Sequence, residues 1–133
     1  MATVAMVLSL TSAAADLTSH ALALNVSEDI TAANTSGIAK IKIGQTAANT
    51  STEILYTASD YTGPVYLYLL NTETTAGNNI YIYDDTSTGS PVIAKLGPGN
   101  VGLIPLGGDK TIRAYSDTTA DFVLEYMVFG TQA

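Results

Sequence analysis

Few side chains in this sequence could do chemistry, and the single histidine is the first to consider. His20 has Ser19 beside it and Asp16 close by in the chain. A Ser–His–Asp set activates a serine nucleophile only when the three groups meet in one geometry, which their closeness in a short polar segment does not predict. Since no other set of residues supplies a matched acid and base, we expect a surface or interface histidine and no enzyme activity.

The acidic turn Asp84-Asp85 is the best candidate for a metal site. With Thr86 and Thr88 it forms a run of oxygen ligands of the kind that Ca²⁺ binds. The run lacks the D-x-[DN]-x-[DN]-G spacing of a calcium loop, and Asp also favours turns through hydrogen bonds to its own backbone. We therefore expect a plain turn here, with no metal and no other cofactor.

The glycines between residues 97 and 108 do not form a phosphate-binding loop. No Gly-Lys-Ser/Thr follows a strand and opens a helix there, so these glycines are expected at turns and bulges. Glycosylation sequons begin at Asn25, Asn34 and Asn49, but chance produces them readily in a chain so rich in Asn, Thr and Ser. Neither feature indicates a function.

The composition indicates one domain with an uncharged surface. A chain of 133 residues is expected to form one domain, 1–133, with residues 1–37 as a candidate N-terminal arm. Charged residues make up 13% of the chain, against about 25% in a typical soluble protein, which suggests that other subunits cover part of the surface. The net charge is −7, and five dispersed cations cannot build a basic patch. We expect no nucleic acid and no anionic membrane as partner.

The N-terminal segment has only part of the pattern of a targeting signal. Val4–Leu10 is apolar, and the small residues Ala13–Ala15 follow it, but no Lys or Arg precedes Lys40. A signal peptide needs a basic start, and a membrane-spanning helix needs about 20 apolar residues in a row, so neither is expected. Cysteine is absent, which excludes disulfides and thiolate metal sites.

The stretch Val65–Asp84 shows the clearest structural pattern. Aliphatic residues alternate with tyrosines on both sides of the polar loop Asn71–Asn79. Because successive side chains of a strand point to opposite faces, the pattern predicts an antiparallel hairpin with an aliphatic face and a tyrosine face. The tyrosine face could be a subunit interface, a platform for stacking sugars, or simple cross-strand packing. It would comprise Tyr66, Tyr68, Tyr81 and Tyr83.

The last predicted strand, Asp121–Phe129, is apolar on both faces. Such a strand lies centrally in a sheet or beneath a partner, and it adds Tyr126 and Phe129 to the candidate interface. Glu125 is expected to be paired or at an edge, because burying a lone carboxylate is costly. The other predicted strands are 4–10, 22–26, 38–43, 53–57, 91–96, 101–106 and 111–115, with turns at 60–64, 97–100 and 107–110.

About eight or nine short strands at this spacing predict an all-β fold, either a β-sandwich or a jelly roll, with an extended N-terminal segment. The segments in order also resemble small virion proteins of tailed bacteriophages. The likeness rests on Ala15–Ser19 with Ala21–Val26, Val65–Tyr68 with Leu70–Thr72, Lys95–Gly99 with Ile104–Leu106, and Ile112–Tyr115 with Val123–Tyr126.

This resemblance implies a structural protein of the capsid decoration or cement type, located on the capsid surface of the virion. The implied partner is the major capsid protein, and the implied assembly is a homo-oligomer, with a trimer favoured. The N-terminal segment would then pair with the body or with a neighbouring subunit. The alternatives are a tail, baseplate or fibre component, and a carbohydrate-binding β-sandwich module that uses its tyrosines.

Overall fold

The computed structural model describes residues 2–11, 23–32, 34–35, 39–43, 53–86, 91–116 and 122–133. Every regular element in these ranges is a β-strand, so the predicted all-β class is confirmed. The chain divides into two compact units, the N-terminal hairpin Met1–Ala32 and the body Ala33–Ala133.

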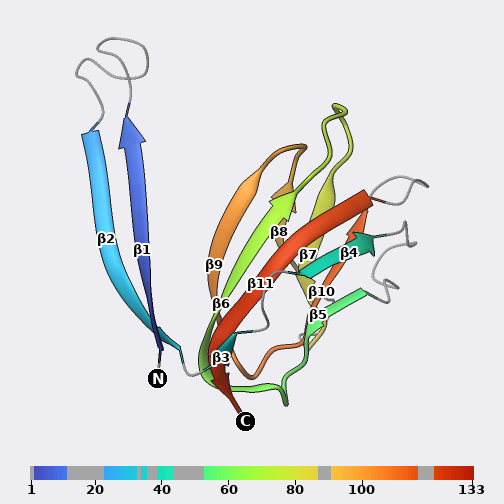
Figure 1. Ribbon diagram of the computed structural model, residues 1–133. Helices are drawn as coiled ribbons and strands as arrows, with labels where there is room; N and C mark the ends of the chain where they lie inside the picture. Colours follow the sequence, from blue (N-terminus) through green and yellow to red (C-terminus); the bar gives the residue numbers. More distant parts are fainter. Residues whose placement is uncertain are drawn as a thin grey trace. The chain divides into compact units, whose positions relative to one another are not determined.

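The N-terminal hairpin is a two-stranded antiparallel ribbon (Figure 1). Strand β1 (Ala2–Thr11) pairs with β2 (Ala23–Ala32) along its whole length, from Ala2 opposite Ala32 to Thr11 opposite Ala23. Strand β1 contains the predicted segment 4–10, and β2 covers residues 23–26 of the predicted segment 22–26; both strands extend beyond the prediction. Long pairing of this kind arises because the two segments share the same alternation of apolar and polar residues.

The body consists of two antiparallel sheets (Figure 1). One sheet has the order β5-β10-β7-β8. Its strands are β5 (Glu53–Tyr56), β10 (Ile112–Ser116), β7 (Ile80–Asp84) and β8 (Val92–Leu96). In the other sheet β11 pairs with both β3 and β4 on one side and with β6 on the other, and β9 follows β6. These strands are β3 (Asn34–Thr35), β4 (Ala39–Ile43), β11 (Phe122–Gln132), β6 (Tyr61–Asn71) and β9 (Val101–Gly107).

The strand order of the body is that of a jelly roll. From β4 onward the chain passes to the other sheet at every connection except the one between β7 and β8. This gives two four-stranded layers, β4-β11-β6-β9 and β5-β10-β7-β8, to which the short β3 adds a fifth strand. The predicted sandwich is therefore confirmed.

The predicted hairpin Val65–Asp84 is wrong. Strand β6 pairs with β11 and β9, whereas β7 pairs with β10 and β8 in the other sheet. Residues 72–79 therefore cross between sheets instead of joining neighbours. Alternation cannot tell the two cases apart, because a hairpin and a crossover both turn their aliphatic residues towards the same core.

Asn71 holds this crossover in place. Its side chain is fully buried, and its Nδ2 donates to the carbonyl oxygens of Asn78 at 2.9 Å and Leu96 at 3.0 Å. Its Oδ1 accepts a hydrogen bond from the backbone N–H of Glu73 at 3.1 Å. One buried amide thus joins both ends of the crossover loop to the end of β8.

Two predicted turns also differ from the structure. The turn predicted at 60–64 belongs largely to β6, where Gly63 has a φ of +79° close to a shift in the β6–β11 register. A glycine tolerates that conformation in a strand, and the irregularity accommodates the following Pro64. The turn predicted as a hairpin at 107–110 instead connects the two sheets.

The core lies between the two sheets of the body. Nine inward side chains of its central strands are aliphatic, with alanine included, and are at most 1% exposed. They comprise Val65, Leu67, Leu69, Ile80, Ile82, Ile112, Ala114, Leu124 and Val128. This packing fixes which residues of β6, β9 and β11 point outward.

Candidate protein-binding surface

The outward side of the β9-β6-β11 sheet carries a nearly continuous apolar surface, here called the outer apolar face. The strand register arranges its side chains in three rows across the sheet. All of them are half-buried or exposed, and eight of the nine are apolar or aromatic. The rows are Pro105–Tyr66–Phe129, Leu103–Tyr68–Met127 and Val101–Leu70–Glu125.

The outer apolar face extends to the edge of the sheet. Strand β9 is the edge strand, and its Val101 and Leu103 are 66% and 38% exposed. Alternation along β9 turns Ile104 and Leu106 towards the core, so Val101 and Leu103 remain on the outward side. Contiguous apolar surface of this kind is typical of a site that binds another protein.

Glu125 is the one acidic side chain on this face. The hydroxyl of Tyr68 donates a hydrogen bond to Glu125 Oε1 at 3.3 Å, so the carboxylate is partnered as expected. Burial raises the pKa of Tyr68, and the charge of Glu125 and this hydrogen bond raise it further. Tyr68 therefore remains a neutral donor at physiological pH, and the face keeps its apolar character.

The structure brings together three of the six predicted interface residues. Tyr66, Tyr68 and Phe129 are neighbours on the outer apolar face. Tyr81 lies on the outward side of the other sheet, so the two halves of the predicted tyrosine face are separated. Tyr83 has no exposed surface, and Tyr126 packs against the core.

The tyrosines on the outward side of the other sheet contact one another and a neighbouring lysine. Tyr115 stacks on Tyr81 with ring centroids 4.9 Å apart, and Lys95 lies over the Tyr81 ring at 5.3 Å from the neighbouring strand. Tyr83 meets Tyr115 edge to face at 5.6 Å. Because Tyr81 is contacted from both neighbouring strands, it offers little open ring surface for a sugar.

Sequence reasoning missed most of the outer apolar face. Gly102 and Pro105 interrupt the apolar pattern of β9, so its outward residues were not assigned to an interface. Leu70 and Met127 were not assigned either, because the predicted interface comprised aromatic residues alone. The alternation along β9 could have indicated these residues, because its outward positions pair one by one with the outward positions of β6.

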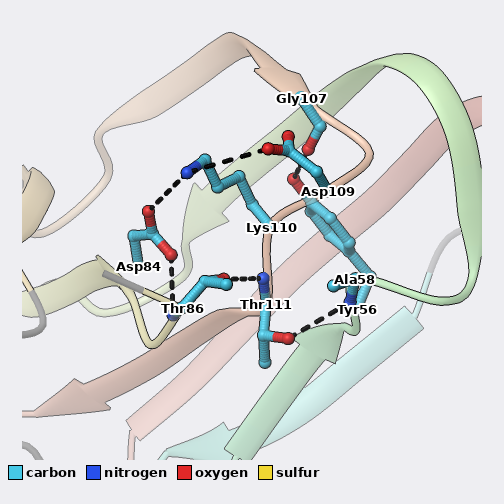
Figure 2. A network of polar contacts seen from close by, with 8 residues as sticks. All are labelled: Tyr56, Ala58, Asp84, Thr86, Gly107, Asp109, Lys110 and Thr111. Atoms are coloured by element: carbon cyan, nitrogen blue, oxygen red, sulfur yellow. Dashed lines mark hydrogen bonds and ion pairs between the residues drawn. The ribbon is translucent and has the colours of Figure 1, made fainter. Parts of the chain in front are cut away.

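A polar cluster lies at one end of the body, where connections between strands meet (Figure 2). Asp84 is 6% exposed, its Oδ1 accepts a hydrogen bond from the Thr86 N–H at 2.8 Å, and its Oδ2 lies 3.5 Å from Lys110 Nζ. The Arg113 side chain lies 2.8 Å from Asp85 Oδ2. Since cations and backbone groups engage both acidic residues, the turn has a structural role.

The remaining contacts of this cluster connect three loops. The Tyr56 hydroxyl donates to the Gly107 carbonyl at 3.2 Å, and burial raises the Tyr56 pKa above its ordinary value, with further contributions from Asp84 and Asp109. The Thr111 hydroxyl accepts a hydrogen bond from the Ala58 N–H at 3.1 Å, and the Thr111 N–H donates one to the Thr86 hydroxyl (Figure 2). The cluster clamps the loops together.

The chemical candidates from the sequence contribute no site in the described part of the chain. His20, with Asp16 and Ser19, and Thr88 lie outside the described residues. Within the described ranges no three His, Cys, Asp or Glu side chains gather as metal ligands, and no helix is long and apolar enough to cross a membrane. The outer apolar face is therefore the best-supported functional surface. No family model, curated protein or solved structure matches the chain.

Proposed function

We propose that this protein is a non-enzymatic structural protein of a bacteriophage virion that decorates and cements the capsid shell. It binds across subunits of the major capsid protein and acts as a homo-oligomer, with a trimer favoured. The observation that carries the proposal is the outer apolar face, a three-strand surface that has one acidic side chain among its nine outward residues.

The composition of this face supports a protein partner. Tyr66, Tyr68 and Phe129 lie on its two inner strands, where large aromatic side chains make the strongest contributions to protein interfaces. Val101 and Leu103 extend the surface to the edge of the sheet. Covering such aliphatic side chains contributes up to about 1.5–3 kcal/mol each, from which the costs of association must be subtracted.

The fold and the low charge also support the proposal. Jelly rolls occur in viral capsid domains as well as in lectins and cupins, so the fold is compatible with a virion protein by analogy only. Charged residues are 13% of the chain, which leaves much of the surface suited to contact with other subunits. Closed symmetric oligomers are the usual assembly for such contacts.

Co-sedimentation with capsid shells that lack the protein tests the proposal. We expect saturable binding of the full-length protein, with protection of the shells against mechanical or thermal rupture. A monomer that does not bind such shells would contradict the proposal. Antibody labelling at the tail would support the alternative of a tail, baseplate or fibre component, and glycan binding that is lost in Tyr66→Ala or Tyr81→Ala would support a carbohydrate-binding module.

A further inference from the structure

Strand β9 has an open edge in the part of the chain that the structure describes. It pairs with β6 on one side, and no strand of the described residues pairs with it on the other. Its seven residues carry no charge, and its pairing with β6 runs without a register shift. Val101 on this strand is 66% exposed, the largest fraction among the described large hydrophobic side chains. Another chain can add a strand to an edge of this kind.

The other described edge strands of the body have features that oppose such pairing. Strands β5 and β8 each carry a charged residue, Glu53 and Lys95, and each shows a register shift against its neighbouring strand. Strand β4 carries Lys40 and Lys42, and β3 has only two residues. Charge, irregular pairing and short length all keep an edge strand from pairing with other chains. Among these described strands only β9 is long, regular and uncharged, which indicates that its edge is paired in the assembled state.

Two hydrogen bonds at the ends of the β6–β9 ladder show where the backbone groups of β9 point. The Asn71 N–H donates to the Asn100 carbonyl at 3.1 Å, and the Gly108 N–H donates to the Gly63 carbonyl at 2.8 Å. Both pairs continue the register of the ladder. Because bonded and non-bonded pairs alternate in an antiparallel ladder, every second residue of β9 directs its backbone groups to the open edge. These residues are Val101, Leu103 and Pro105.

The open edge has two hydrogen-bond donors and three acceptors. Val101 and Leu103 each present an N–H and a carbonyl, whereas Pro105 presents a carbonyl alone, because proline has no N–H. An edge strand tolerates proline at this kind of position, where the missing N–H would have faced away from the ladder. A partner strand therefore bonds most fully around Val101 and Leu103.

This edge is continuous with the outer apolar face. The side chains of Val101, Leu103 and Pro105 begin the three rows of the face, and their backbone groups form the edge beside it. A strand added to β9 places every second side chain in line with these rows. The added strand therefore widens the outer apolar face by one strand and leaves the face itself uncovered.

The size of the edge favours a different protein over a second copy of this chain as its occupant. Seven residues span about 23 Å, and a strand edge with its side chains is about 10 Å wide, so two copies joined along β9 bury about 460 Å² in total. A stable interface buries about 1,000 Å² or more. A partner that also binds the outer apolar face reaches that area, because its added strand continues the contact made by the rows of the face.

We propose that β9 receives an extended segment of the shell protein as an additional strand. The segment has apolar side chains at alternate positions, which continue the rows of the outer apolar face. Its backbone carbonyls accept hydrogen bonds from the N–H groups of Val101 and Leu103. The inference rests on the proposed function, and it adds which part of the partner this protein recognises and which bonds hold that part.

Amide hydrogen exchange of the full-length protein, free and bound to shells that lack it, tests the added strand. In the free protein we expect the N–H groups of Val101 and Leu103 to exchange about tenfold or more faster than those of Gly102 and Ile104, which bond to β6. On the shells we expect exchange at Val101 and Leu103 to slow about tenfold or more, because each N–H then has an acceptor. NMR of the quenched and dissociated samples measures each amide separately.

The variant Leu103→Pro tests the same hydrogen bond by binding. It removes one of the two donors of the edge, and Pro105 shows that the ladder with β6 accepts proline at such a position. The matched control is Leu103→Ala, which also shortens the side chain but keeps the N–H. We expect the proline variant to bind shells about fivefold or more weakly than the alanine variant. Equal binding of the two variants would overturn the added strand.

The other possible results of the exchange measurement would each contradict the proposal. Slow exchange of Val101 and Leu103 in the free protein that depends on protein concentration would show a second copy on the edge. Slow exchange at every concentration would show a segment of the same chain there. Shell binding that leaves both amides in fast exchange would overturn the added strand but not the proposed function. Absence of shell binding would overturn both.

Discussion

Replacing Asn71 with alanine tests whether one buried amide holds the crossover from β6 to β7. The side chain makes three hydrogen bonds, to the carbonyl oxygens of Asn78 and Leu96 and to the N–H of Glu73. In Asn71→Ala these three backbone groups lose their partner. Asn71 has no exposed surface, and its bond to the Leu96 carbonyl is fully buried, so water cannot readily replace it. Asn71→Ala therefore removes three hydrogen bonds without offering the backbone groups another partner.

The expected cost follows from these contacts. Each hydrogen bond contributes about 1 kcal/mol net, which gives about 3 kcal/mol for the three. The unpaired Leu96 carbonyl adds to this, because a buried group without a partner carries a penalty of about 1–3 kcal/mol. We expect Asn71→Ala to lower the free energy of unfolding by about 4–6 kcal/mol, and Tm by well over 10 °C for a body of this size.

Chemical denaturation followed by circular dichroism measures this change. The matched control is Asn79→Ala in the same connection, where the side-chain amide donates to the Gly77 carbonyl in an exposed position. This control should cost less than about 1 kcal/mol, because water can take over the exposed bond. Equal stability of the Asn71 and Asn79 variants would refute the reasoning.

Three further predictions concern the loop cluster and the turns. Asp84→Ala should cost about 1.5–3 kcal/mol in thermal denaturation, while Asp109→Ala, whose side chain is 78% exposed, should cost less than about 0.5 kcal/mol, and equal losses would contradict the clamp. Burial raises the pKa of Tyr56 in the folded state. The neutral Tyr56 side chain therefore contributes to the free energy of unfolding below about pH 10, and this contribution is lost as the pH rises towards the folded pKa. Tyr56→Phe should reduce this alkaline loss of stability, measured by denaturant unfolding at increasing pH, and an unchanged slope would argue against it. Gly108→Ala should lower Tm by several degrees, because a Cβ there would lie 2.7 Å from two backbone carbonyl oxygens, and an unchanged Tm would contradict the close packing.

The strands could be predicted from the sequence, but their partners could not. Alternation correctly placed strands near 65–70, 80–83 and 122–129, since each needs one side turned to the core. It could not show whether consecutive strands pair, because a crossover and a hairpin have the same pattern of buried residues. The role of Asn71 was hidden for the same reason, as an asparagine at the start of a loop normally indicates only a turn.

The candidate surface was predicted only in part. Tyr66, Tyr68 and Phe129 were assigned to an interface, and the structure places them side by side. Tyr126 was assigned with them because β11 is apolar on both sides, and only the packing of the two sheets decides which side turns inward. Tyr83 lies on the β5-β10-β7-β8 sheet, where contacts with neighbouring side chains bury it, and alternation cannot reveal such contacts.

A pair of substitutions tests most directly whether the outer apolar face is the binding surface. Leu103 on this face is 38% exposed and Ile54 on the opposite sheet is 39% exposed, so aspartate at either position should disturb the fold of the body to a similar, small extent. In co-sedimentation with shells that lack the protein, we expect Leu103→Asp to weaken binding about 30-fold or more and Ile54→Asp to bind like the wild type. Wild-type binding by Leu103→Asp, or equal losses in both variants, would contradict the account.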